Sequence, residues 1–194
     1  MEPDLSRDYS QCEEQGHILE YWRGRCGRFL EIGAMDGISY SSTFALVLRG
    51  WSGVALEPSP EACASLRVNL HPYPVICLQR GLAERDGEQE WWDGGGNALG
   101  TTERAHMEMW KKAGAKFTRS TMETVCWDTL LLEFGRNFDL VLIDTEGTSG
   151  RLFKLMPHSF RPEMIIVEHD GADLKRPGYR ELLRNDLNTI LVRK

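Results

Sequence analysis

Four short tracts place acidic side chains, one of them beside a histidine, directly after apolar runs that are typical of buried strands. They are EIGAMDG at residues 31–37, LEP at 56–58, IDTEG at 143–147 and EHDG at 168–171. Glycine allows a tight turn and lets a ligand approach the backbone closely. Carboxylates accept hydrogen bonds from hydroxyls and amines and also bind cations. The tracts therefore predict a polar ligand site where several strands end.

The first tract has the glycines of a ligand-binding turn but not those of a dinucleotide site. The G-x-G-x-x-G fingerprint would place glycine at Met35, and the sequence contains no Walker phosphate loop. Two acidic residues, Glu31 and Asp36, favour a ligand with an amine over one with a phosphate, because opposite charges attract. A plain strand-to-helix turn is the alternative interpretation.

Glu57 ends the second apolar run, 20 residues after Gly37. A carboxylate at this place can accept two hydrogen bonds from the vicinal hydroxyls of a ribose. A glycine turn and a ribose-binding acid without a phosphate loop together favour S-adenosylmethionine. The alternative for Glu57 is a surface glutamate before a proline.

The third and fourth tracts contain the candidate catalytic residues. His169 is the only histidine at a predicted strand end, so His169 and Asp144 are both candidate general bases. Oxygen-rich sites also suit Mg²⁺, which lowers the pKa of a bound hydroxyl. The candidate metal ligands are Asp144, Glu168, His169 and Asp170. The alternatives are a hydrogen-bonded structural histidine and carboxylates that cap helices or order a loop.

Strands and helices are expected to alternate around these tracts. Strands are predicted at 28–34, 52–58, 74–83, 88–92, 117–126, 138–147, 164–171 and, at the sheet edge, 188–194. Helices are predicted at 9–22, 41–49, 60–70, 103–113, 129–134, 151–156 and 178–186. This order predicts an α/β fold whose mainly parallel sheet has helices on both faces. Ligands of such sheets bind beyond the carboxyl ends of the strands.

Several tracts in this order resemble the FkbM family of S-adenosylmethionine-dependent methyltransferases: YSQCEEQGHILEYW, residues 33–60, FDLVLIDTEG and RPEMIIVEHDG. The resemblance extends from about Tyr9 to the end, and 33–58 and I-D-T-E-G are its most specific parts. The family usually has Asp at Glu31 and often Asn at Met35 and Ser42. The resemblance implies a Rossmann-like class I methyltransferase fold over a single domain, 1–194, with a helical segment at 1–27 and an inserted loop and helix at 91–120 near the substrate cleft.

The resemblance also implies a cofactor site and an activity. S-adenosylmethionine would contact Gln11, Glu31, Gly33, Ala34, Asp36, Gly37, Glu57, Pro58, Leu82, Ala83 and Asp144. FkbM-like proteins are chiefly O-methyltransferases, so the expected acceptor is a hydroxyl on a small molecule or sugar, with Asp144 and His169 as the catalytic residues. Asp144 and Glu168–Asp170 also match the places where catechol O-methyltransferase-like enzymes hold magnesium.

The predicted insertion is rich in tryptophan and glycine. Trp91, Trp92 and Trp110 lie in it and Trp127 follows closely, so these rings are expected to form either a substrate wall or part of the core. The tract DGGGNALGTT at 93–102 predicts either a lid that excludes water or a surface loop.

Composition and charge argue against several other classes of protein. A net charge of −6 disfavours a broad nucleic-acid surface. The apolar stretches are too short for a membrane span, and the polar N-terminus differs from a signal peptide. Five cysteines without a C-x-x-C pair predict reduced thiols in a cytoplasmic protein. Two alternatives stay open: a non-catalytic module that binds S-adenosylmethionine or a partner, and a nucleotide-dependent oxidoreductase, which Met35 disfavours. The oligomeric state is not indicated.

Overall fold

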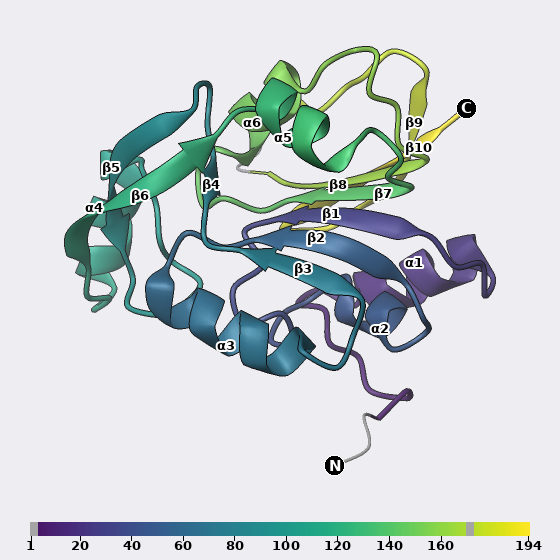
Figure 1. The fold of residues 1–194 in the computed structure, drawn as a ribbon, viewed down its shortest axis with the longest axis horizontal. Coiled ribbons are helices and arrows are strands. Elements are labelled where there is room, and N and C mark those ends of the chain that lie inside the picture. The colour runs from purple at the N-terminus through teal and green to yellow at the C-terminus, as the bar shows by residue number, and fades with distance from the viewer. Residues whose placement is uncertain (1–3, 170–172) are drawn as a thin grey trace.

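Strands and helices alternate through most of the chain, in the order that the apolar runs predict. The computed structural model describes residues 4–169 and 173–194 (Figure 1). In chain order, the elements are α1 (Glu14–Trp22), β1 (Arg28–Ile32), α2 (Phe44–Val47), β2 (Ser52–Leu56), α3 (Pro60–Leu70), β3 (Val75–Leu78), β4 (Gly81–Leu82), β5 (Gly87–Asp93), α4 (Arg104–Lys112), β6 (Thr118–Val125), α5 (Trp127–Phe134), β7 (Leu140–Ile143), α6 (Ser149–Leu155), β8 (Met164–Glu168), β9 (Tyr179–Arg184) and β10 (Asn188–Arg193).

The main sheet has seven strands in the order β3-β2-β1-β7-β8-β10-β9. The five strands from β3 to β8 are parallel, whereas β10 is antiparallel to both of its neighbours. The predicted α/β fold with a mainly parallel sheet is confirmed. The strand order reverses between β1 and β7, and ligands of open parallel sheets bind at such a switch point.

Helices cover both faces of the main sheet (Figure 1). One core lies under α5 and α6 and includes Leu30 and Ile32 of β1. The other lies against α1, α2 and α3 and includes Phe29. Neighbouring residues of β1 therefore point to opposite cores, as the period of two along a strand requires. Because both faces of β1 are buried, an uninterrupted apolar run correctly predicted this strand.

A smaller sheet stands beside the carboxyl ends of the main strands. It has the order β4-β6-β5, and α4 lies alongside it (Figure 1). The single strand predicted at 74–83 is wrong in its second half: β3 ends at Leu78, and Gly81 and Leu82 pair with Thr124 and Val125 of β6. Gly81 permits this pairing because a Cβ there would lie 2.8 Å from Sδ of Met122.

The helix predicted at 178–186 is also wrong, because β9 occupies this segment. Residues of the tract RELLR are good helix formers, but pairing with β10 overrides that weak preference. Asn185 closes the hairpin, since its Oδ1 accepts hydrogen bonds from the amides of Leu187 and Asn188. As a result β9, and not β10, forms this edge of the sheet.

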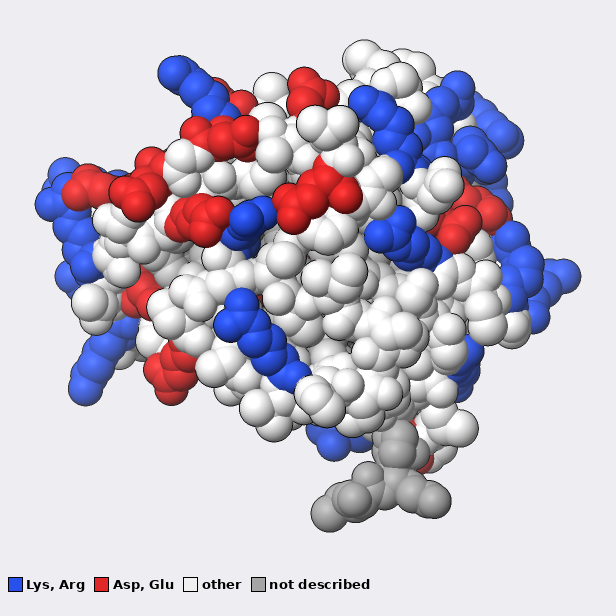
Figure 2. Space-filling model, in the orientation of Figure 1, with Lys and Arg blue, Asp and Glu red and all other residues white. Residues whose placement is uncertain are grey.

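The surface carries a mixture of charges. The face seen in Figure 2 carries both acidic and basic side chains, with uncharged residues between them. Such a mixture is typical of an ordinary solvated protein surface. Within residues 4–169 and 173–194, none of the helices is long and apolar enough to cross a membrane.

Candidate functional site

A cavity of about 1120 Å³ lies between the carboxyl ends of the main strands and the small sheet. Its volume slightly exceeds the usual range for ligand pockets, so it has room for a nucleoside-sized cofactor and a second small molecule. Nine of the residues that the sequence predicts for the cofactor line it: Gln11, Glu31, Gly33, Ala34, Glu57, Pro58, Leu82, Ala83 and Asp144.

Gly33 brings the ends of β1 and β7 together at the switch point. Its φ is 82°, in the left-handed region that glycine tolerates best. A Cβ at this position would lie 1.7 Å from the carbonyl oxygen of Asp144. The amide of Asp144 in turn donates to the carbonyl of Ile32 at 2.9 Å. Only glycine fits between the two strand ends without moving one of them.

Met35 occupies the turn position where the dinucleotide fingerprint would have glycine. Its φ is 48°, again in the left-handed region, and its amide donates to Oε2 of Glu57 at 2.8 Å. The backbone therefore has a glycine-like conformation although the residue is methionine, at the cost of some steric strain. The turn after β1 is tied directly to the acid that ends β2.

Asp36 and Gly37 shape this turn and are not among the residues that line the cavity. Oδ1 of Asp36 accepts hydrogen bonds from the amides of Ile38 at 2.9 Å and Ser39 at 2.7 Å. Gly37 lies against α3, because a Cβ there would be 2.7 Å from Cδ1 of Leu66. A role of these two residues in direct cofactor contact stays a prediction.

Glu31 and Glu57 are buried carboxyl groups at the ends of β1 and β2. Oε1 of Glu57 accepts from the amide of Ser59 at 2.8 Å, and Oε2 of Glu31 accepts from Oγ1 of Thr43 at 2.8 Å. Burial raises the pKa of Glu57 to about 7 and that of Glu31 to about 8. A cationic ligand would offset this desolvation, since opposite charge favours the ionised form.

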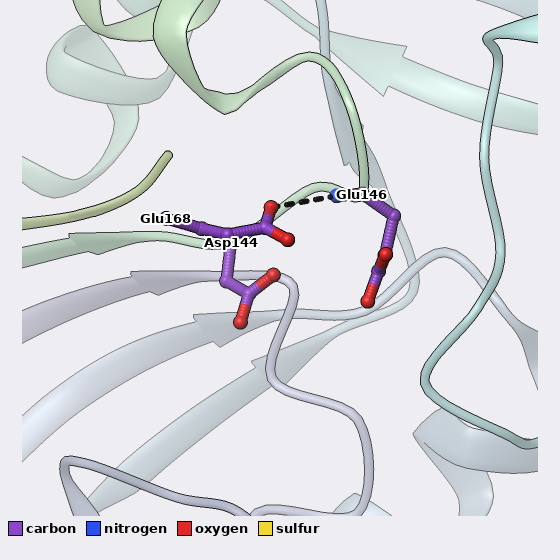
Figure 3. A group of neighbouring side chains, drawn as sticks. All are labelled: Asp144, Glu146 and Glu168. Carbon is purple, nitrogen blue, oxygen red and sulfur yellow. Dashed lines mark hydrogen bonds between the residues drawn. The ribbon is translucent and has the colours of Figure 1, made fainter. Parts of the chain in front are cut away.

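Three more acidic side chains meet at the ends of β7 and β8 (Figure 3). One carboxylate oxygen each of Asp144, Glu146 and Glu168 lies within 4.8 Å of the others. Oε2 of Glu168 accepts from the amide of Glu146 at 3.1 Å and from Oγ of Ser149 at 2.9 Å. Burial, and next the charge of Glu168, raise the pKa of Asp144 well above its usual range and the pKa of Glu146 to about 8. The cavity is thus acidic on both sides of the switch point.

His169 lies at the end of β8 and lines the cavity, as predicted. Its amide donates to the carbonyl of Leu187 at 2.7 Å, and its Nε2 lies 3.0 Å from the carbonyl oxygen of Asn185. A carbonyl only accepts, so Nε2 carries a hydrogen in this contact and a base would have to be Nδ1. Asp170, the remaining predicted metal ligand, lies outside the described residues.

Sequence reasoning missed two residues that the structure places at the acidic cluster. Glu146 was visible in the I-D-T-E-G tract, but it received no role. His106 of α4 had no sequence neighbour to mark it, yet its Nε2 lies 2.9 Å from Oε2 of Glu146. This pairing depends on the small sheet, which brings α4 against the loop after β7.

The four tryptophans divide between the cavity and the core. Trp91 and Trp110 line the cavity. Trp127 is buried, and its Nε1 donates to the carbonyl of Leu152 at 2.9 Å. Trp92 lies on β5 and is not among the cavity-lining residues. Of these four tryptophans, only Trp91 and Trp110 are in a position to form a substrate wall.

Comparisons with known proteins agree with this architecture. Residues 31–185 match the Methyltransferase FkbM domain. Similar solved structures include a hypothetical protein of Thermus thermophilus, with 16% identity, a TM-score of 0.50, and coverage of 100% of this chain and 92% of that chain. Others are cofactor-bound Rv0187 from MTB (18% identity, TM-score 0.49, coverage 96% and 82%) and the O-methyltransferase from Bacillus cereus in complex with SAH (17% identity, TM-score 0.48, coverage 97% and 84%). No curated protein matches the chain.

At 16% identity the Thermus thermophilus structure bears on the fold alone, and the two structures with a TM-score below 0.5 carry no argument. The family match is of a different kind, because it extends over most of the chain, from Glu31 at the end of β1 through β9 to the hairpin residue Asn185. It includes the acids at the ends of β2, β7 and β8 that the geometry places around one cavity. The chain belongs to the FkbM family of S-adenosylmethionine-dependent methyltransferases.

Proposed function

We propose that this enzyme transfers the methyl group of S-adenosylmethionine to a hydroxyl oxygen of a small molecule or sugar. The observation that carries the proposal is the acidic cavity at the switch point, with buried carboxyl groups at the ends of β1 and β2 and the half-buried Asp144 after β7. S-adenosylmethionine has a sulfonium and an ammonium group, so it supplies the positive charge that this lining favours. The pyrophosphate of a nicotinamide dinucleotide would be repelled, which argues against the oxidoreductase alternative.

In this proposal the cofactor lies across the ends of β1 and β2. Gly33 and Ala34 contact its methionine part, and Glu57 holds the ribose hydroxyls. Each oxygen of Glu57 accepts one backbone amide in the structure, and a second lone pair on each remains for a hydroxyl. Leu82 and Ala83 line the cavity next to β6, and in this proposal they contact the adenine.

Asp144 is the proposed general base. The acceptor oxygen attacks the methyl carbon from the side opposite the sulfur, at about 3 Å. The new O–C bond forms as the C–S bond breaks, and the electron pair of that bond remains on sulfur in S-adenosylhomocysteine. The hydroxyl proton passes to Asp144, whose raised pKa brings it closer to the value that suits a base near neutral pH. Nδ1 of His169 is the second candidate for this step.

A magnesium ion is the alternative way to activate the hydroxyl. The residues that fit it are Asp144, Glu146 and Glu168, since carboxylate oxygens are preferred Mg²⁺ ligands and one oxygen of each lies within 4.8 Å of the others. A bound ion would lower the pKa of the acceptor hydroxyl.

Exhaustive chelation separates the two mechanisms. Binding of S-adenosylhomocysteine is expected to survive chelation, because Gly33, Glu57 and Leu82 do not belong to the acidic cluster. Calorimetry checks binding, and release of S-adenosylhomocysteine from S-adenosylmethionine checks turnover. Lost turnover that Mg²⁺ restores would support the metal, whereas full turnover would support direct proton transfer to Asp144 or His169.

Transfer of a labelled methyl group tests the proposed reaction. We expect S-adenosylmethionine labelled in its methyl group to pass the label to a hydroxylated acceptor as an ether, which survives mild base. Methanol released by mild base would instead reveal a methyl ester and a carboxylate acceptor. Cofactor binding without transfer to any of a broad panel of sugars, phenols and alcohols would favour the non-catalytic binding module.

A further inference from the structure

Helix α4 is held directly over the loop that follows β7. Nε2 of His106 lies 2.9 Å from Oε2 of Glu146, and both side chains are only 19% exposed. Oγ1 of the buried Thr101 donates to the carbonyl oxygen of Glu146 at 2.6 Å. Gly147 makes the close approach feasible, since a Cβ there would lie 3.2 Å from Nδ1 of His106. Glycine in the I-D-T-E-G tract therefore makes room for a residue of α4.

One turn further along α4, Trp110 also contacts Nε2 of His106. Nε1 of Trp110 lies 2.7 Å from Nε2 of His106, and both residues line the cavity with Met109. Residues four apart on a helix share a face, so the two rings present one surface to the cavity. Met107 of the same helix is buried and anchors it.

The hydrogen bonds around His106 are incompatible with one another in the protein alone. An indole N–H only donates, and an imidazole Nε2 either carries one hydrogen or offers one lone pair. A single Nε2 can accept from Trp110 or donate to Glu146, but it cannot do both. A ligand hydroxyl can bond whichever group Nε2 does not, because its oxygen accepts from Nε1 of Trp110 or its hydrogen is donated to an oxygen of Glu146.

We propose that His106 and Trp110, together with Glu146, form the acceptor-recognition subsite of this enzyme, and that the acceptor is a neutral, hydroxyl-bearing sugar ring. The proposal rests on the proposed function, because the subsite lies next to Asp144. The apolar face of a sugar ring packs against Trp110, and one ring hydroxyl bonds whichever of Trp110 and Glu146 is not bonded to Nε2 of His106. Three carboxyl groups within 4.8 Å of one another disfavour an acceptor with a phosphate or carboxylate here.

The test measures sugar binding to the protein saturated with S-adenosylhomocysteine. Neutral mono- and disaccharides, the corresponding sugar phosphates, and catechol are titrated by calorimetry well beyond the millimolar range. We expect at least one neutral sugar to bind saturably, and more tightly than its phosphate or catechol. Trp110→Ala is expected to weaken that sugar about tenfold or more, and Trp110→Phe by less, because it retains an aromatic face.

Matched variants separate recognition from folding. His106→Gln should weaken the sugar several-fold, whereas His158→Gln and Trp92→Phe should leave its affinity unchanged, since neither residue lines the cavity. All variants should keep the parent affinity for S-adenosylhomocysteine and a cooperative melt. The proposal is overturned if no neutral sugar binds, if the phosphate or catechol binds better, or if Trp110→Ala leaves sugar affinity intact. A parent protein that fails to bind S-adenosylhomocysteine would instead refute the proposed function.

Discussion

Replacing Asp144 with asparagine is expected to lower turnover by about 10²-fold or more, the scale of general acid–base contributions. Asp144 follows a buried strand, so its backbone is fixed while its side chain reaches the cavity. The carboxylate is required whether it takes the proton, binds a metal or orients the methionine ammonium. The measurement is the rate of S-adenosylhomocysteine release at saturating cofactor and acceptor.

The same substitution should not destabilise the protein. Burial and the nearby Glu168 raise the pKa of Asp144, so the folded state disfavours its charge. A neutral amide of the same size removes that penalty, and we expect a melting temperature equal to or above that of the parent. Asp128→Asn on the exposed start of α5 is the matched control for turnover. If the turnover of Asp144→Asn stays within a few-fold of the parent rate, Asp144 is not the general base and His169 becomes the candidate.

Replacing Gly33 with alanine is expected to abolish measurable cofactor binding and to reduce the free energy of unfolding by about 3 kcal/mol or more. The left-handed backbone costs a residue with a Cβ about 1–2 kcal/mol, and overpacking adds about 1–3 kcal/mol. A Cβ at 1.7 Å from the Asp144 carbonyl oxygen must push β1 and β7 apart. Denaturant unfolding and calorimetry with S-adenosylhomocysteine measure the two effects.

Gly24→Ala provides the control, because Gly24 has a similar φ of 78° but nothing within 4 Å of an added Cβ. We expect it to show only the cost of the left-handed backbone and unchanged cofactor affinity. If Gly33→Ala behaved like Gly24→Ala in both measurements, close contact between the strand ends would not be what holds the site together.

The sequence predicted the main sheet well because its parallel strands are buried on both faces. Leu140–Ile143 is a short apolar run followed directly by Asp144, and Met164–Glu168 is one that ends in Glu168. No solvent-facing residues interrupt either run. The helix predicted at 178–186 was wrong because local residue preferences and long-range pairing disagree there. Its Arg, Glu and Leu residues favour a helix locally, and only the long-range pairing with β10 makes them a strand.

Site residues that directly follow strands could be predicted from the sequence. Site residues that only tertiary contacts bring to the cavity could not. Glu57 and Asp144 could be named because a fold rule places ligands at strand ends. His106 could not be named, since it reaches Glu146 only through the packing of α4 on the loop after β7. Likewise, a sequence pattern could not show that Met35 adopts the backbone conformation expected of glycine.

Calorimetric titration of the unmodified protein with S-adenosylhomocysteine tests the cofactor assignment most directly. We expect saturable binding with a rise in melting temperature, since a ligand that binds only the folded state stabilises it. Glu57→Ala should weaken binding by about 1–3 kcal/mol, the cost of a lost hydrogen bond to a charged group, and NAD should give no heat. Absence of both heat and thermal shift at millimolar S-adenosylhomocysteine would contradict the assignment of this cavity as the cofactor site.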